Sequence, residues 1–77
     1  MNNSRRKRID SIIERIDELM SDLDLIREEE QDAYDNMPES FQDSERGEAM
    51  YNAIDNLESA AGSLEEVEDY LNEAKGE

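Results

Sequence analysis

The chain contains no cysteine and no histidine among its 77 residues. Without cysteine it has no disulfide, no zinc–thiolate site and no thiol nucleophile. Without histidine it lacks the commonest general base, the commonest metal ligand and the usual switch near neutral pH. We therefore expect no cofactor and no metal site. Because no activated group can be named, we also expect that the protein is not an enzyme.

Long apolar runs are missing as well, and none approaches the length of a membrane span. The first residues are basic, but no apolar segment follows them as it would in a secretory signal. The expected location is therefore the cytoplasm.

Apolar residues are scarce, at 35%, whereas charged residues make up 40% of the chain. This composition approaches that of disordered proteins. The apolar residues nevertheless recur at alternating steps of three and four, which places them on one side of a helix. The first such stripe is Ile9, Ile12, Ile16, Leu19, Leu23, Ile26, Ala33 and Met37. The second stripe is Met50, Ala53, Leu57, Ala60, Leu64, Val67, Leu71 and Ala74.

Cap and breaker residues divide these stripes into two helices. Ser4 is a reasonable N-cap, so the first helix is expected at about 4–36. The only proline, Pro38, cannot continue a helix, which predicts a turn at 37–43. The second helix is expected at about 44–74, with Asp43 or Ser44 as its cap.

The turn and the second helix lead to further expectations. Residues 38–42 are expected to form a short turn of their own. Phe41, the only phenylalanine, is expected to plug the open end of the fold. Gly76 follows the second helix as a stop signal. Gly62 lies in mid-helix, where it marks either a close helix crossing or an exposed position.

Two helices of similar length joined by a short turn predict a single all-α domain, an antiparallel helical hairpin that resembles a coiled coil. Further apolar residues widen each stripe beyond a two-stranded seam. A stripe this wide favours a bundle of three or four helices, so we expect two hairpins to pair as a homodimer. The candidate interface residues are Ile13, Met20, Tyr34, Ile54 and Ala61.

Charge is distributed unevenly along the chain, whose net charge is −15. Residues 1–27 are neutral overall, and residues 28–77 carry the whole excess of acid. Such a charge disfavours direct binding to nucleic acid or to an anionic membrane and favours a basic protein surface as partner. Acidic residues are densest around the turn, and the stretch from Glu28 to Glu45 contains no basic residue. The candidate partner-binding residues are Glu28, Glu29, Glu30, Asp32, Asp35, Glu39, Asp43 and Glu45.

A basic cluster occupies the expected first turn of the first helix, where the helix dipole disfavours cations. One interpretation is that these side chains pair with acid at the end of the second helix, at Glu66, Asp69 or Glu73. An alternative is that the cluster binds phosphates, so that the protein sequesters anionic nucleotides. A further alternative is a structural or assembly subunit that binds partners through its apolar stripes. The basic cluster consists of Arg5, Arg6, Lys7 and Arg8.

Two stretches of sequence resemble a known family. Residues 29–40, which read EEQDAYDNMPES, and residues 44–47, which read SERG, are similar to an uncharacterised family of short acidic helical proteins of bacterial and phage genomes. The resemblance implies a helical fold and carries no catalytic residue. In charge and size the chain is also similar to phage-encoded nucleic-acid mimics. That similarity implies an inhibitor that binds the nucleic-acid site of a basic host protein.

The spacing of two acidic pairs is similar to that in helical nucleotide pyrophosphohydrolases. Glu14 with Asp17 and Glu66 with Asp69 have the spacing that holds magnesium in those enzymes. The chain is short for that fold, and such pairs arise by chance in so acidic a sequence. We therefore keep the expectation of a non-enzymatic interaction protein.

Overall fold

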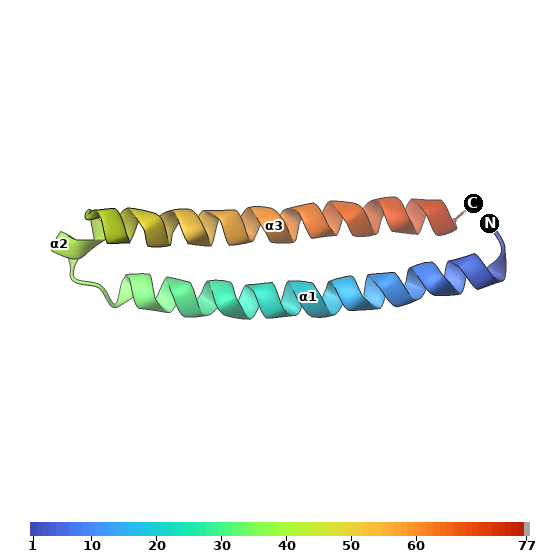
Figure 1. The fold of residues 1–77 in the computed structure, drawn as a ribbon, viewed down its shortest axis with the longest axis horizontal. Helices are drawn as coiled ribbons and strands as arrows, with labels where there is room; N and C mark the ends of the chain where they lie inside the picture. The colour runs from blue at the N-terminus through green and yellow to red at the C-terminus, as the bar shows by residue number, and fades with distance from the viewer. Residues whose placement is uncertain (77) are drawn as a thin grey trace.

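The computed structural model describes residues 1–76 as two long antiparallel helices joined by a short connection (Figure 1). The elements are α1 (Asn3–Asp35), α2 (Glu39–Gln42) and α3 (Glu45–Lys75), and the described residues contain no strand. The molecule is a rod of 58 × 15 × 12 Å, with both chain ends at the same tip. The predicted all-α hairpin is confirmed.

The N-cap of helix α1 lies two residues earlier than predicted. The side chain of Asn2 accepts a hydrogen bond from the backbone N–H of Arg5 at 2.9 Å, which makes Asn2 the N-cap. Ser4 lies inside the helix, so its predicted role as cap is wrong. At the other end the helix stops at Asp35, three residues before Pro38.

The connection is a compact turn built around α2. The backbone N–H groups of Phe41 and Gln42 donate to the carbonyl oxygen of Pro38 at 2.8 and 3.2 Å. The side-chain amide of Gln42 donates to the carbonyl oxygens of Tyr34 and Met37 at 3.1 and 3.2 Å, which satisfies acceptors at the end of α1. The predicted short turn is confirmed. Phe41 stands at the tip of the turn and is 57% exposed, so it does not plug the fold of the single chain.

Helix α3 begins as predicted, at a serine cap. The hydroxyl of Ser44 accepts a hydrogen bond from the N–H of Gly47 at 3.3 Å. Gly47 is buried against the turn, and a Cβ atom there would lie 2.1 Å from the carbonyl oxygen of Gln42. Glycine at this position therefore lets α3 start directly beneath α2.

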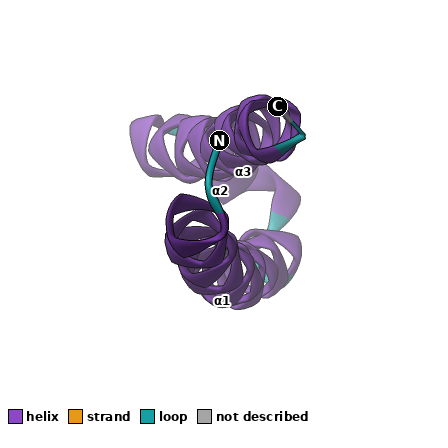
Figure 2. Cartoon of the chain, turned by 90° about the vertical axis from the view of Figure 1, so that its right-hand side faces the viewer, coloured by secondary structure: helices purple, strands orange, loops and turns teal. Residues whose placement is uncertain are grey.

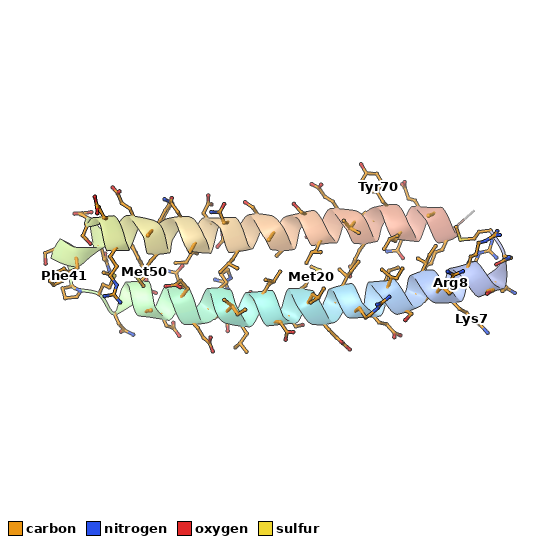
Figure 3. The ribbon with its side chains drawn as sticks, in the orientation of Figure 1. Lys7, Arg8, Met20, Phe41, Met50 and Tyr70 are labelled. Atoms are coloured by element: carbon orange, nitrogen blue, oxygen red, sulfur yellow. The ribbon has the colours of Figure 1, made fainter. Side chains whose placement is uncertain are left out.

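A single seam holds α1 and α3 together, and within residues 1–76 Ile16 and Ile54 are the only buried apolar residues, at 7% and 6% exposure. Other seam residues are half-buried, and Met20 and Met50 lie between the helices in Figure 3. The spacing of three and four corresponds to positions a and d of a heptad. The α1 seam is Arg6, Ile9, Ile13, Ile16, Met20, Leu23, Arg27, Glu30, Tyr34 and Met37. The α3 seam is Gly47, Met50, Ile54, Leu57, Ala61, Leu64, Glu68, Leu71 and Lys75.

The seam differs from the predicted stripes by one heptad position. Ile12, Leu19 and Ile26 were expected to face the core, but they are 37%, 53% and 49% exposed. The α3 residue Val67 is likewise 43% exposed. On α1 two apolar rows run side by side, and a two-helix hairpin covers only one of them. Half of the predicted α1 stripe therefore lies on the surface.

Candidate functional site

The residues that flank the seam differ in character on its two sides. In an antiparallel pair, the e positions of both helices lie on one side of the seam and the g positions on the other. Viewed end-on, the molecule is one pair of helices, so both sides are open (Figure 2). The e positions are Asp10, Asp17, Asp24 and Gln31 on α1 and Tyr51, Glu58, Glu65 and Asn72 on α3. The g positions are Arg5, Ile12, Leu19, Ile26 and Ala33 on α1 and Arg46, Ala53, Ala60, Val67 and Ala74 on α3.

Contacts between the helices agree with this division. On the e side, Asp10 forms an ion pair with Lys75, and Asp24 lines a hollow together with Glu58 and Glu65. On the g side, Ala33 and Arg46 line a separate hollow beside the turn. Each side of the seam therefore presents one continuous face drawn from both helices.

The e side and the neighbouring b positions form what we call the acidic face. Its carboxylates are all exposed, and along α1 they follow one another at steps of three, four or seven residues, a rise of about 5–10 Å per step. Two cations beside the seam are already paired with carboxylates of this face. Arg27 contacts Asp24 at 3.1 Å and Lys75 contacts Asp10. The acidic face consists of Asp10, Glu14, Asp17, Asp24, Glu28, Asp35, Glu48, Asp55, Glu58, Glu65 and Asp69.

Glu68 is a further carboxylate beside the acidic face, and it lies in the seam itself. A hydrogen bond with the carboxyl group of Asp17 raises the pKa of Glu68 above its ordinary value of 4.5, and loss of water and the charges of Asp17, Asp69 and Glu65 raise it further. When Glu68 is ionised, its buried Oε1 has no hydrogen-bond partner within residues 1–76. A hydrogen shared between the carboxyl groups of Glu68 and Asp17 is present only when one of them is protonated, which is why the pKa of Glu68 shifts upward.

The eight predicted partner-binding carboxylates gather at the turn end of the rod but do not share a face. Glu28 and Asp35 belong to the acidic face, whereas Glu29 and Asp32 lie around the far side of α1. Glu30 is half-buried in the seam. The last turn of α1 contains no basic residue. The remaining three, Glu39, Asp43 and Glu45, are exposed around the connection.

The predicted partner-binding residues do not include the carboxylates in the middle of the rod. Among these are Asp17, Asp24, Glu58 and Glu65. A signal for these residues was present, because acid recurs at the e position of successive heptads on both helices. Recognising it requires knowing which residues form the seam.

The basic cluster of residues 5–8 lies in the first turn of α1, which contains no acidic residue. Arg6 turns towards α3, where its Nε donates to the carbonyl oxygen of Lys75 at 2.8 Å. The other three side chains are exposed at different heptad positions, and Lys7 points away from α3 (Figure 3). Within residues 1–76, Arg5 and Arg8 have no carboxylate partner, so their expected pairing with Glu66, Asp69 or Glu73 is not found.

The predicted dimer-interface residues are occupied within the chain. Ile54 is buried, and Ile13, Met20, Tyr34 and Ala61 are half-buried in the seam, where the rings of Tyr34 and Tyr51 lie 6.4 Å apart. The surface left open to another molecule is the g side, which we call the apolar face. The apolar face consists of Ile12, Leu19, Ile26, Ala33, Ala53, Ala60, Val67 and Ala74.

The described part of the chain has neither a metal-binding cluster nor a membrane-spanning helix. No three carboxylates of residues 1–76 come together in a way that could hold a metal ion. In the same residues, no helix combines the length and apolar character needed to cross a membrane.

Comparison with protein-family models, with curated proteins and with solved structures gave no match to this chain. The resemblance to short acidic helical proteins therefore stays a prediction.

Proposed function

We propose that the protein is a non-enzymatic interaction protein whose acidic face binds a basic surface of another protein. The observation that carries this proposal is the gathering of eleven exposed carboxylates on one side of the hairpin. Because these charges repel one another, they lower the stability of the rod. A cationic partner removes that repulsion when it binds.

The physical character of the acidic face suggests the class of partner. A long negative surface steers positively charged molecules and raises their rate of association. Surfaces that bind nucleic acid are built from lysine and arginine. We therefore propose that the partner is a basic protein, with a nucleic-acid-binding site as the preferred target. Occupation of that site would inhibit nucleic-acid binding by competition.

The test uses two variants with the same change in net charge. The first neutralises the acidic face with Asp17→Asn, Asp24→Asn, Glu58→Gln and Glu65→Gln. The control neutralises four exposed carboxylates on the outer backs of the two helices, Glu18, Asp32, Glu66 and Glu73. Proteins that co-purify with the chain at low salt are identified, and the affinity of each is measured for both variants.

We expect the acidic-face variant to lose the partner while the control keeps most of its affinity. Displacement of double-stranded DNA from the identified partner then tests the competition. Equal losses in both variants would mean that only net charge matters. Full binding by the acidic-face variant would refute the proposal.

Anion binding by the basic cluster is the alternative function, and the arrangement of the cluster favours it less. Arg6 is engaged with the end of α3, and the remaining cations point in different directions around α1. Several chains would have to meet to form one pocket. Calorimetry with a panel of nucleotides tests this alternative, because the absence of heat for every nucleotide eliminates it.

Pairing of two hairpins into a four-helix bundle is the second part of the proposal. The chain exposes 5854 Å², whereas a folded monomeric protein of its mass typically exposes about 4,800 Å². The difference of about 1,000 Å² exceeds the roughly 800 Å² that each partner contributes to a standard interface. Sedimentation equilibrium measures the mass directly, and a monomer at all concentrations would exclude the bundle.

A further inference from the structure

We infer that the apolar face binds the same face of a second copy, with α1 packed antiparallel against α1 of the partner and Leu19 at the two-fold axis. This inference rests on the four-helix bundle proposed above and specifies its surface and its register. The observations that carry it are the composition of the apolar face, its spacing and the charges along its rim.

The apolar face repeats with heptad spacing on both helices. On α1, three large side chains stand seven residues apart, at Ile12, Leu19 and Ile26, and each is more than a third exposed. On α3 the same position holds Arg46 beside the turn and then Ala53, Ala60, Val67 and Ala74. A row that repeats every seven residues can pack against an antiparallel copy of itself. A two-fold contact uses the same patch on both chains, as this symmetry requires.

Leu19 is the middle one of the three large α1 side chains, so an axis through it lets the row pair with itself. The Asp10–Lys75 ion pair and the Tyr34–Tyr51 ring contact align the two helices. This alignment puts Leu19 at about the same height as Val67. An axis through Leu19 therefore pairs Ile12 with Ile26 of the partner subunit.

Charges on the outer rim of the apolar face, at position c of α1, favour this arrangement. The rim carries Arg8 and Arg15 in its first half and Asp22 and Glu29 in its second half. Along α1, Arg15 and Asp22 lie at nearly equal distances on the two sides of Leu19, and so do Arg8 and Glu29. An antiparallel copy of α1 therefore brings each arginine near an acidic residue of the other chain, which favours this orientation.

The alternative two-fold arrangement packs α1 against α3 of the partner. The corresponding rim of α3 is uncharged, with Asn56, Ser63 and Tyr70 at position c. The rim charges of α1 would then have no partner of opposite sign. Charge complementarity therefore selects the contact between the two α1 helices.

This arrangement has a consequence for the acidic face. The e side lies opposite the g side across each seam, so the two acidic faces of the dimer point outward in opposite directions. The dimer thus presents two equivalent negative surfaces, each as long as the rod. A basic partner would bind at two sites for each dimer.

The first test uses single cysteines, which are unambiguous in a chain that has none of its own. We expect Leu19→Cys to form a covalent homodimer with a short bismaleimide, since the two copies of residue 19 meet at the axis. The control is Leu25→Cys, at a site of similar exposure on the outer back of α1. A cross-link between Leu19→Cys and Val67→Cys chains, without a Leu19→Cys homodimer, would overturn the register while leaving the bundle intact.

The second test exchanges charges at the rim and does not touch the apolar residues. Arg15→Glu is expected to raise the dimer dissociation constant about 5- to 10-fold, because two rim contacts are lost in each dimer. Combining Arg15→Glu with Asp22→Arg is expected to restore the constant to within about twofold of the original. Circular dichroism confirms that each variant stays helical. Failure of the second change to rescue the first would overturn the proposed contact, whereas a monomeric parent chain would instead refute the bundle.

Discussion

Glu68 is the carboxylate that fits the seam least well. The hydrogen bond with Asp17, loss of water and the negative charges of Asp17, Asp69 and Glu65 all raise its pKa. The folded state therefore holds a proton at this site more tightly than the unfolded state does. The stability linked to this proton is fully present below the ordinary pKa of 4.5 and is lost as the pH rises through the folded value.

The first prediction follows from this linkage. Glu68→Gln keeps the shape of the side chain and removes the charge, so we expect a higher melting temperature at neutral pH. We also expect stability to change less between neutral and mildly acidic pH than in the parent chain. Thermal unfolding followed by circular dichroism across this range measures both effects. Glu66→Gln removes an equal charge from an exposed site and is expected to change the pH profile much less.

The second prediction concerns two glycines with opposite surroundings. A Cβ atom at Gly62 would meet nothing within 4 Å, whereas one at Gly47 would overlap the backbone of Gln42. We expect Gly62→Ala to increase the free energy of unfolding by about 0.5–1 kcal/mol, since alanine favours the helix. We expect Gly47→Ala to decrease it by about 1–3 kcal/mol through overpacking. Urea unfolding tests both, and a loss of stability in Gly62→Ala would show that another element packs there.

At the scale of the elements, the start of α1 depends on a single side chain. Asn2 provides the cap, and Ser4 already lies within the first turn. We therefore expect Asn2→Ala to lower the free energy of unfolding by about 1 kcal/mol. Ser4→Ala should change it by only a few tenths of a kcal/mol, because no cap is lost. A larger effect at Ser4 than at Asn2 would mean that the helix begins later.

The existence and ends of the helices could be predicted because local signals determine them. Pro38 stops α1 from continuing through the connection, and Ser44 starts α3 where a capping residue was expected. The cap of α1 was placed two residues late because three polar residues in succession can serve as caps. Each of these signals acts over one turn of helix, so it can be read from a single segment.

Which apolar row of α1 forms the seam could not be predicted in the same way. On α1, the rows containing Ile12 and Ile13 are both apolar, and either could face a partner. The structure uses the row of Ile13 although that row also contains Arg27, a polar residue that the apolar pattern treats as an interruption. Which row is chosen depends on α3, at long range. The candidate surfaces depend on this choice, so the acidic and apolar faces were missed together.

At the scale of the whole molecule, the rod is too thin to bury a large core. Its radius of gyration is 17.4 Å, against about 11.5 Å for a compact domain of this length. The chain as described buries two apolar residues, so apolar burial within one copy contributes little to stability. If a second copy covers the apolar face, folding is coupled to association.

The fourth prediction follows from this coupling. We expect the melting temperature of the chain to rise with protein concentration, because mass action favours the folded dimer. Leu19→Asp places a charge in the proposed interface and is expected to abolish this dependence. Leu25→Asp, on the outer back of α1, is the control and should retain it. A concentration-independent melting temperature in the parent chain would contradict folding coupled to dimerisation.

The last prediction separates the two surfaces by their response to salt. Two chains that each carry a net charge of −15 repel one another, and salt screens this repulsion while leaving apolar contacts in place. We therefore expect the dimer to become tighter as sodium chloride is raised from about 50 mM to about 500 mM. Binding of a basic partner to the acidic face should weaken over the same range, because the attraction between opposite charges is screened. Sedimentation and titration calorimetry measure the two equilibria on one sample. If both equilibria weakened together, attraction between charges would dominate the contact between copies, and the apolar face would not be its basis.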